Sequence, residues 1–480
     1  MVSLIKEQLK ERARTIVELP DHFQPVIEEY FEGENGEGEA MFSWIDEQQD
    51  DGISISLDLD GNLTSLSIEL KKTNTDKVSL NESELKEQAE QFLRRHYPHA
   101  LQDLTYYQTK KLTDTYRLYY EQIVMGLPLA HAGCYIDVAP SGEIVNFKYY
   151  GLQPEPKIPK TLVAKENLIE HVQNQLDFQL IITNLDSVIH DVAEDGLRLL
   201  YNSELFMTYK ADAVEPTFTI IYEEDEDYSE TYVSLPPPHS VMRKDVSIEE
   251  IIGITEEMEI IREVDWGEET GIVWRNRDWK MEENDLSMNS YFQSHNEDTV
   301  KAFISKKTGE VRRFVWFKDR SGDLSLNSEE CYQKAIDFLQ MTIPNYDQYL
   351  QLIVRDNNDE LDDTRMKEVF SFHVHNGHGI PVYSEIVAVT VNRQTGLIDY
   401  YSGPSFDFEQ LRHMASEPVI SKKEAYDIFL NHLDFELVWN KNYEENEESY
   451  TLVYQPCDRH TRKSIRYIDA ITGAVITEKN

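Results

Sequence analysis

The feature that most restricts the fold of this chain is an internal duplication. A stretch with the apolar spacing of an amphipathic helix occurs twice, as Leu85, Ala89, Phe92 and Leu93 and again as Cys331, Ala335, Phe338 and Leu339. These positions share one helical face. Both copies begin with an Asn-x-x-Glu capping pattern and end just before a proline, and all the matches have the same offset. This agreement predicts two copies of one structural unit.

Strand-like segments follow both helices. Residues 116–120 alternate between two sets of side chains, as expected for a strand with two distinct faces. Gly126-Leu127-Pro128-Leu129 and Gly379-Ile380-Pro381-Val382 then interrupt the two copies with residues typical of a hairpin connection. Each copy ends in a short strand that carries a tyrosine doublet. One unit is therefore predicted to be a helix followed by an antiparallel meander of three or more strands.

A glycine turn extends the repeat beyond this pair. It occurs five times, each time with an aliphatic residue two positions after the glycine: Gly61 and Leu63, Gly142 and Ile144, Gly309 and Val311, Gly396 and Ile398, and Gly473 and Val475. A tight hairpin with positive φ explains the glycine, and burial explains the aliphatic residue. A further pair of matching segments, 176–180 and 433–437, is interpreted as helical. The chain is predicted to be α+β, with two homologous halves of three units each.

The boundaries of the units follow from these matches. The first half spans 1–235, with units near 1–70, 80–151 and 160–222, and the second half spans 248–480, with units near 248–318, 326–403 and 418–480. Between the halves, an acidic run precedes Pro236, Pro237 and Pro238, a composition typical of a stiff, solvated spacer. We therefore place a proline-containing linker at 236–247. The third unit of the first half lacks the glycine turn, so we expect it to be rebuilt.

The charge of the chain restricts its partners. Lys and Arg total 46 against 89 Asp and Glu, which gives a formal net charge of −43. Nucleic acids and anionic membranes are therefore poor partners, because they bind surfaces rich in Lys and Arg. No apolar run approaches the roughly 20 residues of a membrane span, and the first residues show no secretory signal. The three cysteines give neither a disulfide framework nor a paired zinc motif. We expect a cytoplasmic protein without a cofactor.

The repeated motifs resemble a known family. The Gly-x-Pro hairpins, the glycine turns and the segment Ile468-Asp469-Ala470-Ile471-Thr472-Gly473 are similar to PepSY-like units. The organisation in two halves resembles the YcdB/YcdC repeated-domain family of Gram-positive bacteria, over nearly the whole chain. This resemblance implies tandem PepSY-like units, each a helix packed on an antiparallel sheet. PepSY-like units also occur in propeptides that bind and restrain a peptidase, and in sensor proteins, whereas the YcdB/YcdC family implies no established activity.

The strongest candidate for chemistry is a group of three histidines, His373, His375 and His378. His373 and His375 stand two apart on a predicted strand, so they share one face and could hold a metal. By sequence matching, their counterparts in the first half are Tyr120, Gln122 and Met125, none of them a strong ligand. No His-Glu-x-x-His helix or cysteine pair completes a zinc site. A half-exposed strand face is therefore the favoured interpretation, and a metal-assisted hydrolase is the alternative.

Acidic segments offer a weaker candidate for cation binding. Residues Asp319 to Glu330 imitate part of a calcium loop, but Leu324 stands where an EF-hand needs glycine. Glu330 is also explained as a helix cap. The acidic runs at 223–227 and 356–360 are interpreted as solvated loops.

The sequence offers no clear nucleophile. Cys134 and Cys331 occupy apolar positions of the repeat and are predicted to be core residues. Cys457 lies close to His460, but no nucleophile motif accompanies it. No catalytic residue and no metal ligand is therefore assigned.

The 27 tyrosines admit two interpretations, packing between adjacent units and a surface that binds a protein or peptide. Four doublets fall at the ends of predicted strands: Tyr106-Tyr107, Tyr119-Tyr120, Tyr149-Tyr150 and Tyr400-Tyr401. Neighbouring residues on a strand face opposite ways, so one ring packs inward and the other can face solvent. Tyrosine is favoured at protein interfaces because it combines apolar area with a polar tip. Packing between adjacent units is the simpler explanation of the doublets.

These observations predict a non-enzymatic binding protein that holds a protein or peptide partner, with restraint of a peptidase as one form of that role. A metal-assisted hydrolase on the His373 strand and a structural or assembly component are the alternatives. The identity of the partner, the binding residues and the oligomeric state are left open.

Overall fold

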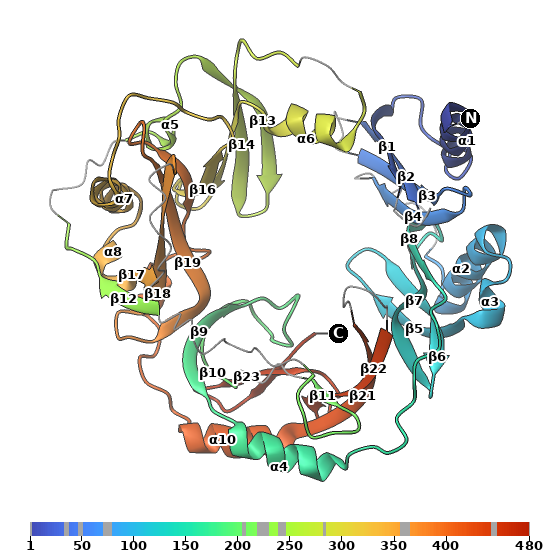
Figure 1. The fold of residues 1–480 in the computed structure, drawn as a ribbon. Coiled ribbons are helices and arrows are strands. Elements are labelled where there is room, and N and C mark those ends of the chain that lie inside the picture. Colours follow the sequence, from blue (N-terminus) through green and yellow to red (C-terminus); the bar gives the residue numbers. More distant parts are fainter. Residues whose placement is uncertain are drawn as a thin grey trace.

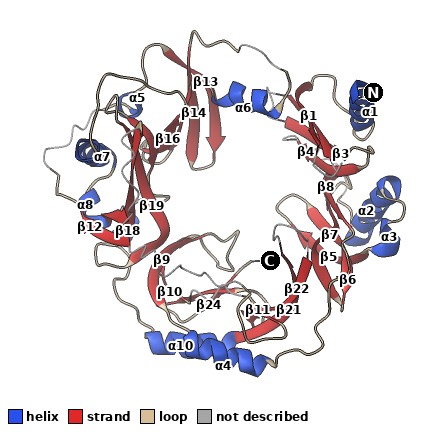
Figure 2. Ribbon diagram, in the orientation of Figure 1, coloured by secondary structure: helices blue, strands red, loops and turns tan. Residues whose placement is uncertain are grey.

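The computed structural model describes residues 2–32, 38–46, 51–70, 79–203, 208–217, 230–238, 246–281, 285–355, 365–442 and 449–479. In this part of the chain the fold is α+β, with ten helices and two large, mainly antiparallel sheets of 11 and 13 strands. The elements follow one another around a ring, with most helices on its outer side and strands toward its centre (Figure 1 and Figure 2). None of the described helices is long and apolar enough to cross a membrane.

The first two units of the first half share one sheet. The first unit contains α1 (Val2–Arg14), β1 (Gln24–Glu32), β2 (Gly38–Asp46), β3 (Asp51–Asp58) and β4 (Leu63–Glu69). The second contains α2 (Glu82–His96), α3 (Ala100–Asp103), β5 (Thr105–Lys111), β6 (Tyr116–Val124), β7 (Leu127–Val138) and β8 (Ile144–Gly151). Strand β4 pairs with β8 and so joins the two meanders. One core, which includes Phe42, Leu93 and Phe147, serves both units.

The second half repeats this plan. Its first unit contains α5 (Ile248–Ile252), β13 (Met258–Trp266), β14 (Glu269–Asn276), α6 (Met288–Asn296), β15 (Thr299–Ser305) and β16 (Val311–Trp316). Its second contains α7 (Ser328–Thr342), α8 (Tyr346–Tyr349), β17 (Leu350–Arg355), β18 (Lys367–His375), β19 (Pro381–Asn392) and β20 (Ile398–Ser402), and the short helix α9 (Glu409–Arg412) follows. Strand β16 pairs with β20, as β4 pairs with β8.

The duplicated helices form as predicted. In α2 and α7 the side chain of the N-cap asparagine, Asn81 or Asn327, accepts a hydrogen bond from the N3 backbone, while the N3 glutamate closes the capping box. All five turn glycines have positive φ, between 69° and 91°, which confirms the predicted tight turns. Leu63 and Val311 are buried, whereas the other three aliphatic residues of the turns are half-buried.

Helix α6 has no counterpart among the described residues of the first half. It lies in the connection between β14 and β15, whereas only four residues separate β2 from β3. The segment at its N-terminus contacts the outer edge of β1, since the Glu28 N–H donates to the Leu286 carbonyl at 2.7 Å and the Met288 N–H donates to Glu29 Oε2 at 2.9 Å. This contact closes the ring between the first unit of the first half and the first unit of the second half (Figure 1).

The third units exchange strands between the halves. The earlier one contains α4 (Lys165–Gln175), β9 (Gln179–Leu185), β10 (Gly196–Asn202) and β11 (Tyr209–Lys210). The later one contains α10 (Lys422–His432), β21 (Leu433–Asn442), β22 (Ser449–Asp458), β23 (Ile465–Asp469) and β24 (Val475–Thr477). Strand β9 joins β19 of the second half in parallel, β21 joins β7 of the first half in parallel, and β10 pairs with β23. Each half is therefore extended by the third unit of the other.

Side chains of the two third units interlock around these strands. The rings of Phe178 and Phe429 lie 5.7 Å apart, and the Tyr201 hydroxyl donates to the Ile420 carbonyl at 2.7 Å. The interpretation of 176–180 and 433–437 as helical is wrong. Helices α4 and α10 end at the first leucine of each match, which is already extended, and the residues that follow lead into β9 and form β21.

The segment before the prolines packs on the second half. Strand β12 (Glu230–Ser234) pairs antiparallel with β17, Leu235 is buried, and the Tyr346 hydroxyl donates to the Pro236 carbonyl at 2.7 Å. Residues 230–234 therefore form an exposed edge strand on the sheet of the second half. The acidic run at 223–227 lies outside the described residues, and the linker at 236–247 stays a prediction.

Candidate binding site

The strand ladders relate the two halves differently from sequence matching. Tyr120 lies opposite Cys134 of β7, and Phe372 occupies the same place opposite Val387 of β19. His373 and His375 therefore correspond to Glu121 and Ile123, and each pair flanks a β-bulge. The predicted counterparts of these two histidines, Tyr120 and Gln122, are therefore wrong by one position. Met125, the predicted counterpart of His378, lies in the turn itself. The cause of the one-position error is the connection between equivalent ladder pairs, which has five residues from His375 to Pro381 and four from Ile123 to Pro128.

Two of the three histidines contact neighbouring groups through their rings. The His373 ring lies 4.5 Å from the Tyr232 ring of β12, His375 Nδ1 accepts the Gly377 N–H at 3.0 Å, and His378 is exposed in the turn. Burial lowers the pKa of His373 and of His375 and so favours their neutral forms. Among the described residues, no three His, Cys, Asp or Glu side chains are grouped so that they could hold a metal ion.

His373 and His375 line a surface cavity of about 470 Å³. Strand β12 supplies Tyr232 and Glu230 to its wall, and β19 supplies Tyr383 and others. The packing of the inter-half segment on β17 therefore shapes this cavity, which sequence reasoning could not anticipate because β12 is not part of the repeat.

The corresponding place in the first half holds an aromatic surface, here called the tyrosine face. It consists of Tyr119, Tyr135 and Tyr150 with Arg117 and His131, and these residues line a cavity of about 230 Å³. Ring centroids lie 6.4 Å apart for Tyr119 and Tyr135, 6.3 Å for Tyr135 and Tyr150, and 5.3 Å for His131 and Tyr150. The Arg117 guanidinium stacks 4.0 Å from the Tyr135 ring.

Two further groups define the tyrosine face. Asp137 accepts two hydrogen bonds from Arg117, at 2.6 and 2.8 Å, and so fixes the guanidinium in place. Glu121 lies in the same cavity, where burial raises its pKa to about 7. The face therefore offers rings, a positioned cation and a carboxyl group that is largely neutral below pH 7.

The prediction that each tyrosine doublet points two ways is confirmed. Tyr120 and Tyr401 are only 1% exposed, and Tyr149 packs in the core with its ring 3.8 Å from that of Tyr97. Their neighbours Tyr150 and Tyr400 are 37% and 39% exposed. In the remaining doublet, Tyr107 is exposed and Tyr106 packs against the core. Three of the four doublets thus expose one of their two rings, and Tyr119 of the fourth is half-buried.

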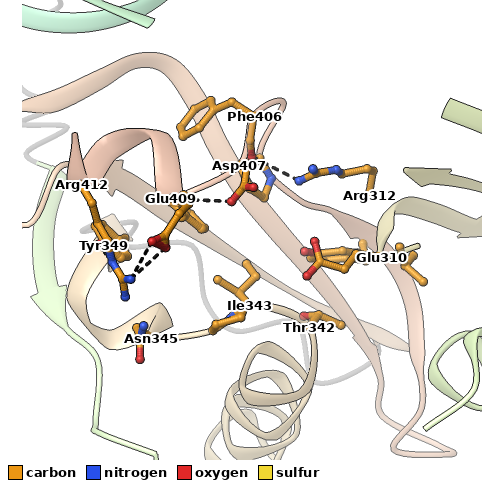
Figure 3. Close-up of a pocket in the computed structure, with 15 residues that line it drawn as sticks. Glu310, Arg312, Thr342, Ile343, Asn345, Tyr349, Phe406, Asp407, Glu409 and Arg412 are labelled. Carbon is orange, nitrogen blue, oxygen red and sulfur yellow. Dashed lines mark hydrogen bonds and ion pairs between the residues drawn. The ribbon is translucent and has the colours of Figure 1, made fainter. Parts of the chain in front are cut away.

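A smaller cavity, of about 90 Å³, lies where α7 ends (Figure 3). Figure 3 shows Arg412 turned toward Glu409, with which it forms an ion pair of 2.8 Å. Arg412 also donates to the Tyr349 hydroxyl at 3.3 Å, and Arg312 donates to the Phe406 carbonyl at 3.2 Å. Because its charged groups already bond to one another, this cavity is a weaker candidate than the tyrosine face.

The remaining candidates of the sequence are structural. Cys134 and Cys331 are buried in the core, as predicted. Cys457 is also buried, and its burial raises the thiol pKa to about 11, so the reactive thiolate is disfavoured at neutral pH.

In the segment that imitates a calcium loop, two of the acidic residues have other contacts. Glu330 closes the capping box of α7, and Asp319 is exposed and pairs with Lys367 at 3.6 Å. The acidic runs at 223–227 and 356–360 lie outside the described residues.

The fold and this surface define a class of protein: a closed array of repeated helix-and-sheet units that carries an aromatic face. Residues 6–151 and 242–405 match the model of the YcdB, YcdC repeated domain. The chain belongs to this family. The matched segments cover the first two units of each half, so the exchanged third units lie almost wholly outside the repeated domain.

Two curated relatives resemble the chain over nearly its full length. It is 33% identical to the uncharacterized protein YcdB of Bacillus subtilis, over 98% of this chain and 97% of that protein. It is 30% identical to the uncharacterized protein YcdC of the same organism, over 96% of this chain and 100% of that protein. Among solved structures, the Bacillus megaterium YpeB C-terminal domain aligns with a TM-score of 0.27 and 13% identity, over 44% of this chain and 95% of that one.

Proposed function

We propose that this protein is a non-enzymatic binding protein that holds a segment of a protein or peptide partner on the tyrosine face. Restraint of a peptidase is one form that this role would take. The observation that carries the proposal is the grouping of Tyr119, Tyr135, Tyr150, His131 and Arg117 around one cavity.

The chemistry of this face suits the recognition of polypeptide. Tyrosine and arginine contribute most of the binding energy at many protein interfaces, because they offer large contact area and directed hydrogen bonds. Here the rings stand on the central strands of a sheet whose opposite side is packed against α2, so little conformational entropy would be lost on binding. The paired Arg117 is already oriented for a partner carbonyl or carboxylate.

The test begins with capture of partners from a lysate of the native host by the tagged full chain, with and without EDTA, followed by affinity measurement with each purified partner. The variant Tyr135→Ala/Tyr150→Ala should weaken binding at least tenfold, because two central rings are lost. Tyr400→Ala removes an exposed tyrosine from the second half and serves as the control. A partner that binds the double variant as tightly as the wild type would overturn the assignment to the tyrosine face.

A further inference from the structure

The sheets of the two halves end differently at one equivalent edge. In the second half, the outer edge of β17 is covered by β12, with Glu230 opposite Arg355 and Ser234 opposite Gln351. In the first half, the equivalent strand β5 pairs with β6 alone among the strands of the described residues. Within the part of the chain that the structure describes, the same edge therefore occurs twice, once with an added strand and once without one.

The ladders also give the register in which such a strand lies. Leu352 of β17 faces Phe372, as Tyr106 of β5 faces Tyr120, so these two positions correspond. Strand β5 has a bulge at Tyr107, between its pairs at Tyr106 and Gln108.

Counting past the bulge brings two basic residues into correspondence. Lys110 of β5 falls at the place of Arg355 in β17. Arg355 donates to Glu230 of the added strand at 3.0 Å. A basic residue therefore stands at this position of the edge in both halves.

We propose that the open edge of β5 accepts an extended acidic segment of a partner protein as an added antiparallel strand. The model for this interaction is the contact that β12 makes with β17 within the chain. The backbone of the segment would pair with Thr105–Lys111, and an acidic residue near its N-terminal end would meet Lys110 and Lys111.

Charge supports an acidic occupant. Lys110 and Lys111 have no ion-pair partner among the described residues, although the chain carries a net charge of −43. Arg117, which lies opposite Lys110 in the ladder, is itself a cation, and the carboxylate that it binds, Asp137, is already engaged. Pairing of a neutral strand with this edge is disfavoured, because it would desolvate the ammonium groups of the lysines. An acidic strand offsets that cost by forming ion pairs with them. The same two residues thus discourage promiscuous pairing and select a partner.

This edge is a different surface from the tyrosine face, and the inference does not depend on the proposed function. The two can fail separately, because β5 binds through its backbone edge and the tyrosine face binds through side chains on β6, β7 and β8.

The experiment uses the full chain and a fluorescein-labelled peptide with the sequence of residues 229–235, Ser-Glu-Thr-Tyr-Val-Ser-Leu. Fluorescence anisotropy should show binding that weakens at least tenfold when the peptide glutamate is replaced by lysine. Lys110→Glu/Lys111→Glu in the protein should cause a similar loss. Lys334→Glu/Lys423→Glu reverses two exposed charges on α7 and α10 and should leave binding unchanged. Tyr135→Ala/Tyr150→Ala should also leave it unchanged, which separates this proposal from the previous one.

Hydrogen exchange locates the peptide. Slower exchange at the amides of β5 supports the proposal. Slower exchange confined to other strands, or equal affinity for the charge-reversed peptide, overturns it. If the protein forms a dimer by light scattering and the peptide dissociates it, the occupant is a second copy of this chain and the assignment to a partner protein is wrong.

Discussion

At the scale of single residues, the two halves place different titratable groups at the same bulge. Glu121 stands in the first half where His373 stands in the second. Burial raises the pKa of Glu121 to about 7 and lowers the pKa of His373, so in both halves it favours the neutral form. The two equivalent positions are thus alike in disfavouring a charged side chain, although one carries a carboxyl group and the other an imidazole.

The pH dependence of stability should report on Glu121. Its pKa rises from 4.5 to about 7 on folding, so the folded state binds more protons than the unfolded state in this range. The contribution of Glu121 to stability therefore falls as pH rises from 4.5 to 7, by less than about 3 kcal/mol, because solvent partly screens this half-buried carboxyl group. Urea unfolding of Glu121→Gln at several pH values should show this fall reduced. Glu87→Gln, which changes an exposed residue of α2, should retain it. If both variants behave alike, Glu121 is not the titrating group.

At the scale of elements, the irregular pairing of β6 with β7 brings the two strands close together at one glycine. Gly133 has a φ of 99°, and a Cβ there would overlap the backbone carbonyl of Tyr120. Glu121, which lies opposite Gly133 in the ladder, lines the cavity of the tyrosine face. The sequence pattern does not mark Gly133, because it is not one of the turn glycines.

Replacing this glycine should therefore be costly. Gly133→Ala should lower the free energy of unfolding by about 3 kcal/mol or more, through both strain and overlap. Gly126→Ala is the matched control: its φ is 77° but no atom lies within 4 Å of the added Cβ, so it should cost only about 1 kcal/mol. Chemical denaturation of both variants distinguishes them. Equal losses would mean that backbone conformation alone, rather than the close approach, explains the glycine.

The local elements were the part of the fold that the sequence predicted best. The capping boxes of α2 and α7 and the glycine turns depend on neighbouring residues, which carry their own signals. The correspondence of the histidines was wrong because one extra residue in a turn shifts the register without altering the motifs on either side. The tyrosine doublets gave the orientation of single rings, but Arg117 and His131 join them only through the pairing of β6 with β7 and β8.

At the scale of the whole molecule, the ring is closed in two unlike ways. Helix α6 contacts the edge of β1 through a few hydrogen bonds, while the exchanged third units join the halves through pairs of strands and a shared core. Neither closure could be predicted from the sequence, since β7 with β21 and β9 with β19 are parallel pairs between segments that lie far apart in the chain.

The two closures should differ in strength. Glu29→Ala removes the acceptor of the Met288 N–H and should speed hydrogen exchange in α6 and β1 with little effect on global stability. Trp439→Ala removes a buried ring whose Nε1 donates to the Val124 carbonyl at 3.1 Å, and should cost about 3–5 kcal/mol. Mass-spectrometric exchange and urea denaturation measure the two effects. A larger loss of stability in Glu29→Ala than in Trp439→Ala would reverse this ranking.

The strand exchange sets an order in time for synthesis on the ribosome. The core of the first two units draws only on residues up to 149, so it can assemble while the chain is still being made. Strand β10 has to wait for β23, because Leu200 finds its place beside Asp469 close to the end of translation. During that interval the nascent chain displays apolar side chains such as Leu168, Val172 and Phe178, which are buried in the finished protein. A ribosome that stalls in the second half would therefore release a chain whose N-terminal units are folded and whose third unit exposes apolar side chains. Chaperones and proteases recognise such partly folded chains.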